Sequence, residues 1–219
     1  MARMRPSPAM PSAPASADAL LFDLGGVVIQ IDFARAIQAW AEAGGVPAAQ
    51  VHARFSLDAG YEAHERGEIE PAAYCAHLRQ TLGLELADEH LLSGWNRIFV
   101  GEVPQVGALL AQLAKSYPLY AFSNTNVAHR MFWQVRYATL LEPFSQIFCS
   151  CDLGTRKPSP AAFREVASRI QTAPARIVFF DDHPDNVRGA REAGLRAHEV
   201  HCADEIRAAL RREGIVCDC

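Results

Sequence analysis

The chain has 219 residues, a length that suits one large domain or one domain with an insertion. Half of its residues are hydrophobic and 21% are charged, which is typical of a globular protein with a packed core. The formal net charge of -4 argues against nucleic acid or an anionic membrane surface as the main partner. No apolar run approaches the ~20 residues of a membrane-spanning helix, so we expect no membrane partner.

The amino-terminal stretch has a biased composition. Residues 1–17 are rich in Pro, Ala and Ser and contain no acidic residue. They lack the apolar stretch of a secretory signal, so we expect a disordered tail. The remnant of an organelle-targeting segment is the alternative.

The six cysteines do not have the spacing of a structural metal site. Cys149 and Cys151 are separated by one residue, as are Cys217 and Cys219, which is too close for half of a zinc site. The first pair lies in the strand-like run QIFCSC, where both side chains would face the same side. We expect all six thiols to be structural and reduced, which indicates a cytoplasmic protein.

The first predicted element is an apolar strand that begins at Ala19 in the run ALLFDLGGVVIQ. It leads into Asp23 and then into Gly25 and Gly26. A carboxylate at the carboxyl end of a buried strand, beside glycine backbone, is where open α/β sheets place their chemistry. Many α/β proteins have an acidic residue there, so the motif needs support from the rest of the chain.

Residues 32–103 follow a helical pattern that contains no convincing strand. Two helical faces stand out by their apolar spacing. The first comprises Phe33, Ile37, Trp40, Ala41 and Gly44, and the second comprises Leu91, Leu92, Trp95, Ile98 and Phe99. We therefore predict that residues 32–103 form a small α-helical cap domain inserted directly after the first strand.

The second half of the chain alternates short apolar runs with helical patterns. The predicted strands are Leu119–Phe122, Ile147–Cys151, Ile177–Phe180 and Leu195–Val200. Helical spacing is found in Val106, Leu109, Leu110 and Leu113, and again in Phe163, Val166, Ala167 and Ile170. Pro160, after Ser159 as a cap, and Pro184 stand where helices begin.

This alternation predicts an α/β fold, with a Rossmann-like parallel sheet between two layers of helices. Residues 18–31 and 104–219 would make up this discontinuous core domain.

Carboxylates follow two of the predicted strands. Asp23 follows the first strand, and Asp181 and Asp182 follow RIVFF. Two carboxylates from separate strand ends suit Mg²⁺, which prefers oxygen ligands. A lone aspartate can also attack phosphorus or carbon and form a covalent intermediate. The alternative is that these acids are strand-end caps or surface carboxylates.

Two further motifs could bind a phosphate group. Ser123 and Asn124 follow the strand in PLYAF, where a hydroxyl and backbone N–H groups can hold a phosphate oxygen. Lys157 lies in the loop sequence GTRKP, and its ammonium could neutralise both phosphate and carboxylates. Alone, Lys157 would be read as a surface lysine.

Together these residues resemble the haloacid dehalogenase superfamily, whose members are mostly phosphohydrolases. Four segments carry the resemblance in order: FDLGGV (22–27), FSNTN (122–126), LGTRKP (153–158) and FFDDHPDN (179–186). It covers nearly the whole chain after residue 18. The cap segment HERGEI (64–69) and the run FDLGGVVIQIDF (22–33) are most similar to members that hydrolyse sugar 1-phosphates.

The resemblance implies a role for each residue of the phosphate site. Asp23 would be the nucleophile that becomes an aspartyl phosphate. Ser123 and Lys157 would hold the phosphoryl oxygens, with Asn124 beside them.

It also implies a magnesium site. Asp23, Asp182 and the backbone carbonyl of Gly25 would bind the Mg²⁺ ion. Asp181 and Asn186 would orient the metal site and Lys157.

Gly25 departs from the superfamily pattern. Phosphatases of this superfamily usually carry an aspartate there as general acid and base, a role worth ~10²–10⁴ in rate. The absence of this general acid and base would matter less for a sugar 1-phosphate, because its anomeric hydroxyl is a good leaving group. Substitute proton carriers could be His64, Glu65 or His183. The alternative is that these three are ordinary exposed side chains without such a role.

The leading hypothesis is a Mg²⁺-dependent phosphatase that acts on a small phosphorylated metabolite, with a sugar phosphate as one candidate. One alternative is a metal-independent hydrolytic dehalogenase in which Asp23 attacks carbon. Another is a catalytically silent binding protein. Substrate discrimination is expected from the cap segment 61–68, with His64 and Glu65 as binding residues. The oligomeric state does not follow from the sequence.

Overall fold

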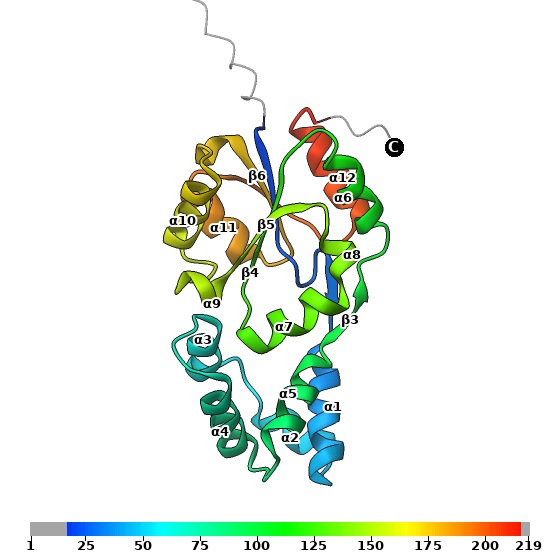
Figure 1. The fold of residues 1–219 in the computed structure, drawn as a ribbon, viewed down its shortest axis with the longest axis vertical. Coiled ribbons are helices and arrows are strands. Elements are labelled where there is room, and N and C mark those ends of the chain that lie inside the picture. The colour runs from blue at the N-terminus through cyan, green and yellow to red at the C-terminus, as the bar shows by residue number, and fades with distance from the viewer. Residues whose placement is uncertain (1–16, 216–219) are drawn as a thin grey trace, which may run out of the picture.

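The structure, a computed structural model, describes residues 17–215 of the chain. Residues 1–16 of the expected tail, together with Cys217 and Cys219, lie outside the described residues. The centre of the molecule is a five-stranded parallel sheet with the order β5-β4-β1-β6-β7 (Figure 1). Its strands are β1 (Ala19–Phe22), β4 (Leu119–Ser123), β5 (Phe144–Cys149), β6 (Ile177–Asp181) and β7 (Arg196–Glu199).

Helices cover both faces of this sheet, which confirms the predicted three-layer α/β fold. Side chains alternate along β1, so that Leu20 and Phe22 join one hydrophobic cluster and Leu21 joins another. The first cluster includes α6 (Val106–Leu113) and α12 (Ala203–Arg212), and the second includes α10 (Pro160–Ile170) and α11 (Pro184–Glu192). Figure 1 shows these two helix pairs on opposite sides of the sheet.

The remaining elements of the core are short connections around the sheet. They are α7 (Val127–Arg136), α8 (Ala138–Leu141), α9 (Ser150–Leu153) and the 3₁₀-helix η1 (Pro174–Arg176). Pro160 and Pro184 begin their helices as predicted, but the side chain of Ser159 makes no capping hydrogen bond. Within residues 17–215, none of the helices combines the length and apolar character that crossing a lipid bilayer requires.

The predicted strand Ile147–Cys151 is wrong at its carboxyl end. β5 ends at Cys149, and α9 begins at Ser150. Cys149 is therefore buried at a strand end while Cys151 lies half-buried in a helix, so the two thiols do not share a strand face. The four described cysteines, Cys75 and Cys202 included, are free thiols.

Five helices pack around a hydrophobic cluster of their own below the sheet in Figure 1. They are α1 (Phe33–Gly44), α2 (Ala48–Arg54), α3 (Ala59–Glu65), α4 (Pro71–Leu82) and α5 (Asp88–Asn96). Trp40 and Trp95 stack at the centre of this cluster with ring centroids 5.4 Å apart. The indole N–H of Trp40 donates to the carbonyl of Leu91 over 2.9 Å, so the buried donor is satisfied. We call these five helices the cap.

A two-stranded antiparallel ribbon joins the cap to the core. Its strands are β2 (Ile29–Ile31) and β3 (Phe99–Glu102). The expectation that residues 32–103 hold no strand is thus wrong, because Phe99 begins a strand after α5 ends at Asn96. The chain enters and leaves the cap along this ribbon, so the two crossings lie side by side.

Candidate active site

The carboxyl ends of three neighbouring strands bring the predicted site residues together. Asp23 directly follows β1, Ser123 ends β4 and Asp181 ends β6. The backbone N–H of Asp23 donates to the carbonyl of Phe180 over 2.8 Å, which ties the two strand ends together. Carboxylate oxygens of Asp23, Asp181 and Asp182 lie within 4.8 Å of one another. We call these three residues the acidic centre.

Lys157 is buried inside the acidic centre. Its side chain is 1% exposed, and Nζ lies 2.8 Å from Asp23 Oδ1 and 2.7 Å from Asp181 Oδ2. Burial opposes the charge on Lys157, but the attraction of Asp181 and Asp23 outweighs it and raises the pKa of the ammonium. Burial, together with the charges of Asp181 and Asp182, raises the pKa of Asp23 against the pull of Lys157. Three carboxylates therefore share one ammonium.

Asp181 has both carboxylate oxygens engaged. Oδ1 accepts hydrogen bonds from the backbone N–H of His183 over 2.8 Å and from the Asn186 side chain over 2.9 Å. Oδ2 accepts from Lys157. Asp181 thus fixes the lysine and the start of α11, where Asn186 lies.

Asp182 is less buried than its neighbours and lies against the turn after β1. A Cβ atom on Gly26 would lie only 2.1 Å from Asp182 Oδ2, and Gly26 has a φ of +87°. Only glycine allows the turn to approach the carboxylate this closely. Burial and the neighbouring Asp181 raise the pKa of Asp182.

Ser123 and Asn124 lie beside the acidic centre, but the Asn124 side chain is already occupied. Its amide donates to the carbonyl of Lys157 and accepts from the N–H of Lys157, each over 2.9 Å. This two-point contact holds the lysine loop against the end of β4. The hydroxyl of Ser123, 3.4 Å from the Asn124 carbonyl, makes only a long contact.

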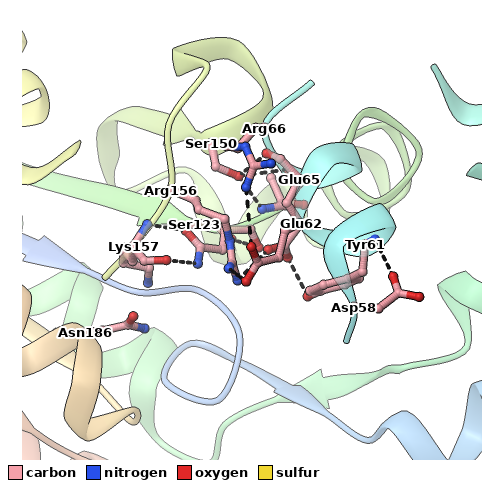
Figure 2. A network of polar contacts seen from close by, with 12 residues as sticks. Asp58, Tyr61, Glu62, Glu65, Arg66, Ser123, Ser150, Arg156, Lys157 and Asn186 are labelled. Atoms are coloured by element: carbon pink, nitrogen blue, oxygen red, sulfur yellow. Dashed lines mark hydrogen bonds and ion pairs between the residues drawn. The ribbon is translucent and has the colours of Figure 1, made fainter. Parts of the chain in front are cut away.

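The end of α3 contacts the core through an ionic network (Figure 2). Arg156, next to Lys157 in the loop, lies 2.8 Å from Glu62 Oε1 and 2.9 Å from Glu65 Oε2. We call this three-residue contact the cap latch. The hydroxyl of Tyr61 donates to Glu65 Oε1 over 2.5 Å. Burial raises the pKa of Glu65, although Arg156 and Tyr61 oppose the rise.

Backbone contacts bring the same segment close to α9. The hydroxyl of Ser150 donates to the carbonyl of Glu65 over 2.6 Å. A Cβ atom on Gly67 would lie 2.4 Å from the carbonyl oxygen of Cys151. The cap segment 61–68 therefore lies directly on the core.

A cavity of about 60 Å³ lies between the cap and the core. Polar groups on its wall come from Tyr61, Glu65, Ser123, Asn124, Thr125 and His129, and the backbone of Gly25 lines it as well. Apolar wall residues come mainly from the ribbon and its neighbours: Leu24, Ile29, Ile31, Phe33, Ile98, Phe99 and Trp133. The cavity thus joins the strand-end site to the latch.

His64 and His183, two of the predicted proton carriers, do not line this cavity. His64 is 2% exposed, and its ring stacks on Tyr74 with centroids 4.2 Å apart. Burial lowers the pKa of His64 to about 4. The ring of His183 accepts a hydrogen bond from the N–H of Asp185 over 3.3 Å, as the cap of α11. Only Glu65 of the three predicted carriers lies on the cavity wall.

Sequence reasoning missed Arg156, Ser150 and His129, and it included Tyr61 only as part of the cap segment 61–68. The charge of Arg156 beside Lys157, opposite an acid-rich cap segment, was a usable signal for the latch. The sequence contains no such signal for Ser150 or His129, because their contacts depend on which loops the fold brings together.

Comparisons with known proteins agree with this arrangement. The family model for haloacid dehalogenase-like hydrolases matches residues 17–194. D-ribitol-5-phosphate phosphatase from Bacteroides thetaiotaomicron is 25% identical over 197 residues, covering 87% of this chain and 95% of that protein. Phosphatase MT3486 of Mycobacterium tuberculosis is 24% identical over 213 residues, covering 93% of this chain and 94% of that protein.

Solved structures show the same fold. A haloacid dehalogenase (HAD) family enzyme from Bacteroides thetaiotaomicron, crystallised with magnesium and inorganic phosphate, superposes with a TM-score of 0.75 and 28% identity. The match covers 86% of this chain and 96% of that one. The chain is therefore an enzyme of the haloacid dehalogenase-like hydrolase family.

Proposed function

We propose that this enzyme is a Mg²⁺-dependent phosphatase that hydrolyses a small phosphorylated metabolite through an aspartyl phosphate on Asp23. The observation that carries the proposal is the acidic centre with Lys157 buried in it. The names of the two curated relatives support a phosphatase. The magnesium and phosphate bound to the solved HAD family enzyme support the choice of metal.

The acidic centre fits a magnesium ion because its charges do not balance. Three carboxylates face one ammonium in a buried volume, and a divalent cation would offset the remaining negative charge. Carboxylate oxygens are also the ligands that Mg²⁺ prefers. We assign Asp23, Asp182 and the Gly25 carbonyl as ligands, while Asp181 and Asn186 hold Lys157 in place. When bound, the ion would supply positive charge to the phosphoryl oxygens.

In this proposal, each step of the reaction is assigned to particular residues of the chain. A carboxylate oxygen of Asp23 attacks phosphorus, forming an acyl phosphate as the bond to the ester oxygen breaks. Ser123 and Lys157 hold the phosphoryl oxygens, while Asn124 fixes the lysine loop. Water then attacks the phosphorus atom, the bond between phosphorus and the Asp23 oxygen breaks, inorganic phosphate is released and the carboxylate is regenerated.

Glu65 is the residue we assign to proton transfer in place of the aspartate that Gly25 lacks. It lines the cavity together with Gly25 and Ser123. Its raised pKa brings the carboxyl group nearer to the range in which it can both give and take a proton. A Cβ atom on Gly25 would lie 3.3 Å from Ile31, so Ile31 crowds the position of the usual aspartate.

The decisive experiment measures phosphate release from p-nitrophenyl phosphate and from a panel of sugar and polyol phosphates. The proposal expects Mg²⁺-dependent release that EDTA abolishes and that an Asp23→Asn control lacks. Release no greater than that of the control would overturn it. Metal-independent release of chloride from 2-chloropropionate would instead favour the dehalogenase alternative.

A further inference from the structure

Ser150 is a buried polar residue to which the proposed reaction assigns no role. It is the first residue of α9, directly after strand β5, and it is 0% exposed. Its side chain lies where the cap segment 61–68 rests on the core. A buried hydroxyl without partners is costly, so the hydrogen bonds of Ser150 show what it connects.

The hydroxyl of Ser150 is hydrogen-bonded to both the core and the cap. The backbone N–H of Thr125 donates to Ser150 Oγ over 2.9 Å. The hydroxyl lies 2.6 Å from the carbonyl oxygen of Glu65 and 3.0 Å from that of Thr125 (Figure 2). A hydroxyl has a single proton, so it donates mainly to the nearer carbonyl, that of Glu65. Ser150 therefore accepts from the core and donates to the cap.

The core partner, Thr125, belongs to the loop that carries the proposed phosphate-binding residues. Ser123 ends β4, and Thr125 follows two positions later on the wall of the cavity. Between them, the side chain of Asn124 makes the two hydrogen bonds that fix the backbone of Lys157. A displacement of Thr125 would therefore be transmitted both to the Ser123 hydroxyl and to the lysine loop.

The cap partner, Glu65, is the last residue of α3. The cap latch holds the side chain of Glu65, whereas Ser150 holds its backbone. The two contacts differ in kind, because the latch depends on the charge of Arg156 and the Ser150 bond joins neutral groups. Ser150 thus fixes the end of α3 relative to the phosphate-binding loop.

The position of the second carbonyl gives the Ser150 proton two alternative acceptors. With the cap in contact, the proton is directed to Glu65. If the cap moves away, the hydroxyl can turn to the carbonyl of Thr125, which is already within 3.0 Å. The buried donor is satisfied in both arrangements, so its rotation separates two discrete states of the contact.

Resting on the proposed phosphatase function, we propose that Ser150 is a positioning residue that couples phosphate binding at the strand ends to the contact between cap segment 61–68 and the core. Phosphate held by Ser123 and Lys157 fixes the loop after β4. The N–H of Thr125 then holds the Ser150 oxygen, and the Ser150 proton holds the end of α3. Ser150 acts through these residues and does not touch the phosphate.

The test measures amide hydrogen exchange of residues 61–68 in the full chain with Mg²⁺, with and without inorganic phosphate. Saturating phosphate is expected to slow this exchange by about fivefold or more, because a ligand at one of two coupled sites stabilises the other. A change below about twofold in the wild-type enzyme would overturn the inference without any variant.

The variants then assign the coupling to one hydroxyl. Ser150→Ala is expected to reduce the phosphate-dependent slowing to less than about twofold and to weaken phosphate binding, because coupling between two sites is reciprocal. A merely structural role would lower the melting temperature and leave the slowing intact. Ser159→Ala is the matched control, since the Ser159 side chain makes no capping hydrogen bond at the start of α10. The wild-type response in a folded, phosphate-saturated Ser150→Ala enzyme would overturn the inference.

Failure of the underlying function gives a different result. A wild-type enzyme that neither binds inorganic phosphate nor hydrolyses p-nitrophenyl phosphate with Mg²⁺ would overturn the phosphatase proposal and this inference with it. Hydrolysis without any effect of phosphate on exchange in residues 61–68 would overturn this inference alone. If Ser150→Ala does not fold, Ser150→Cys takes its place with the same expected loss, because a thiol keeps the volume but hydrogen-bonds weakly.

Discussion

Within the described residues, the side chain of Asp23 makes two polar contacts, and both are made by the same oxygen. Oδ1 accepts from the backbone N–H of Leu24 over 2.7 Å and lies 2.8 Å from Lys157 Nζ. In the proposed mechanism, Oδ2 is therefore the oxygen left for attack on phosphorus. The same arrangement leaves the carboxylates of the acidic centre with more charge than Lys157 alone can balance.

We expect Asp23→Asn to abolish phosphatase turnover by about 10³-fold or more while the fold is retained, because an amide cannot form the acyl phosphate. Phosphate release and circular dichroism of the purified variant check this. Wild-type activity in a folded variant would remove Asp23 as the nucleophile.

We expect Asp182→Ala to eliminate Mg²⁺-dependent activity, because it removes one of the two carboxylates assigned as ligands. Isothermal titration calorimetry should show lost Mg²⁺ binding. The control is Asp185→Ala, which removes an acid that is paired with Arg188 on the surface of α11. Equal Mg²⁺ affinity in the two variants would show that Asp182 is not a ligand.

We expect Glu65→Gln to lower kcat for an alkyl phosphate much more than for p-nitrophenyl phosphate, whose leaving group needs no proton. The pH–rate profile for the alkyl ester should lose the limb that belongs to Glu65. His64→Phe is the comparison, since His64 is buried against Tyr74 and does not line the cavity, and it should change both substrates to the same small extent. Equal losses on both substrates in Glu65→Gln would rule out proton transfer by this residue.

At the scale of elements, apolar spacing and proline positions predicted those helices whose limits depend on neighbouring residues in the sequence. Apolar spacing located α6, and Pro160 and Pro184 marked the starts of α10 and α11. The β2–β3 ribbon could not be predicted, because Phe99 pairs with Ile31 across the entire cap. Periodicity carries no information about such long-range pairing.

The candidate site was likewise predictable where it depends on strand ends, and not where it depends on contacts between distant segments. Asp23, Ser123 and the Asp181–Asp182 pair lie at the carboxyl ends of their strands, and parallel strands bring such ends together. Lys157 reaches the same place from the loop between α9 and α10. The end of β5 was missed because the apolar run QIFCSC gives no sign that the Ser150 hydroxyl binds the carbonyl of Glu65. Interactions between the cap and the core depend on three-dimensional placement.

The cap latch is the element-scale contact with the clearest test. We expect Arg156→Ala to lower kcat/KM by about tenfold, because the cap loses its ionic contact beside Lys157. Faster amide hydrogen exchange in α3 should accompany the loss. Glu62→Gln, which leaves the lysine loop untouched, should shift both measurements in the same direction.

Arg169→Ala serves as the control for the latch. Arg169 pairs with Glu165 over 2.7 Å on the exposed face of α10, away from the cap. The latch would have no functional role if Arg156→Ala and Arg169→Ala gave the same kinetics and the same exchange in α3.

At the scale of the whole molecule, the cap and the sheet domain keep separate hydrophobic clusters. Buried polar groups lie at their contact surface, among them His129 and Glu65. The stability of this arrangement should therefore depend on pH.

The pKa of His129 is lowered from 6.5 in the unfolded chain to about 3 in the folded protein. Below pH 6.5 the unfolded state binds the proton more readily, so the free energy of unfolding falls as the pH drops. The expected loss from this residue is about 1 kcal/mol between pH 7.5 and 5.5. Urea unfolding at both values should show a smaller loss in His129→Phe, and an equal loss would contradict the lowered pKa.

Arg156 and Lys157 are consecutive in the chain, yet they serve different parts of the molecule. Lys157 binds the acids of the core, and Arg156 binds two acids of the cap that are one helical turn apart, Glu62 and Glu65. This adjacency restricts the exchange of caps between related enzymes. A grafted cap without acids at this spacing would leave the Arg156 guanidinium without these partners, next to Lys157. Chimaeras built on this core should therefore carry the acidic pair along with the new cap.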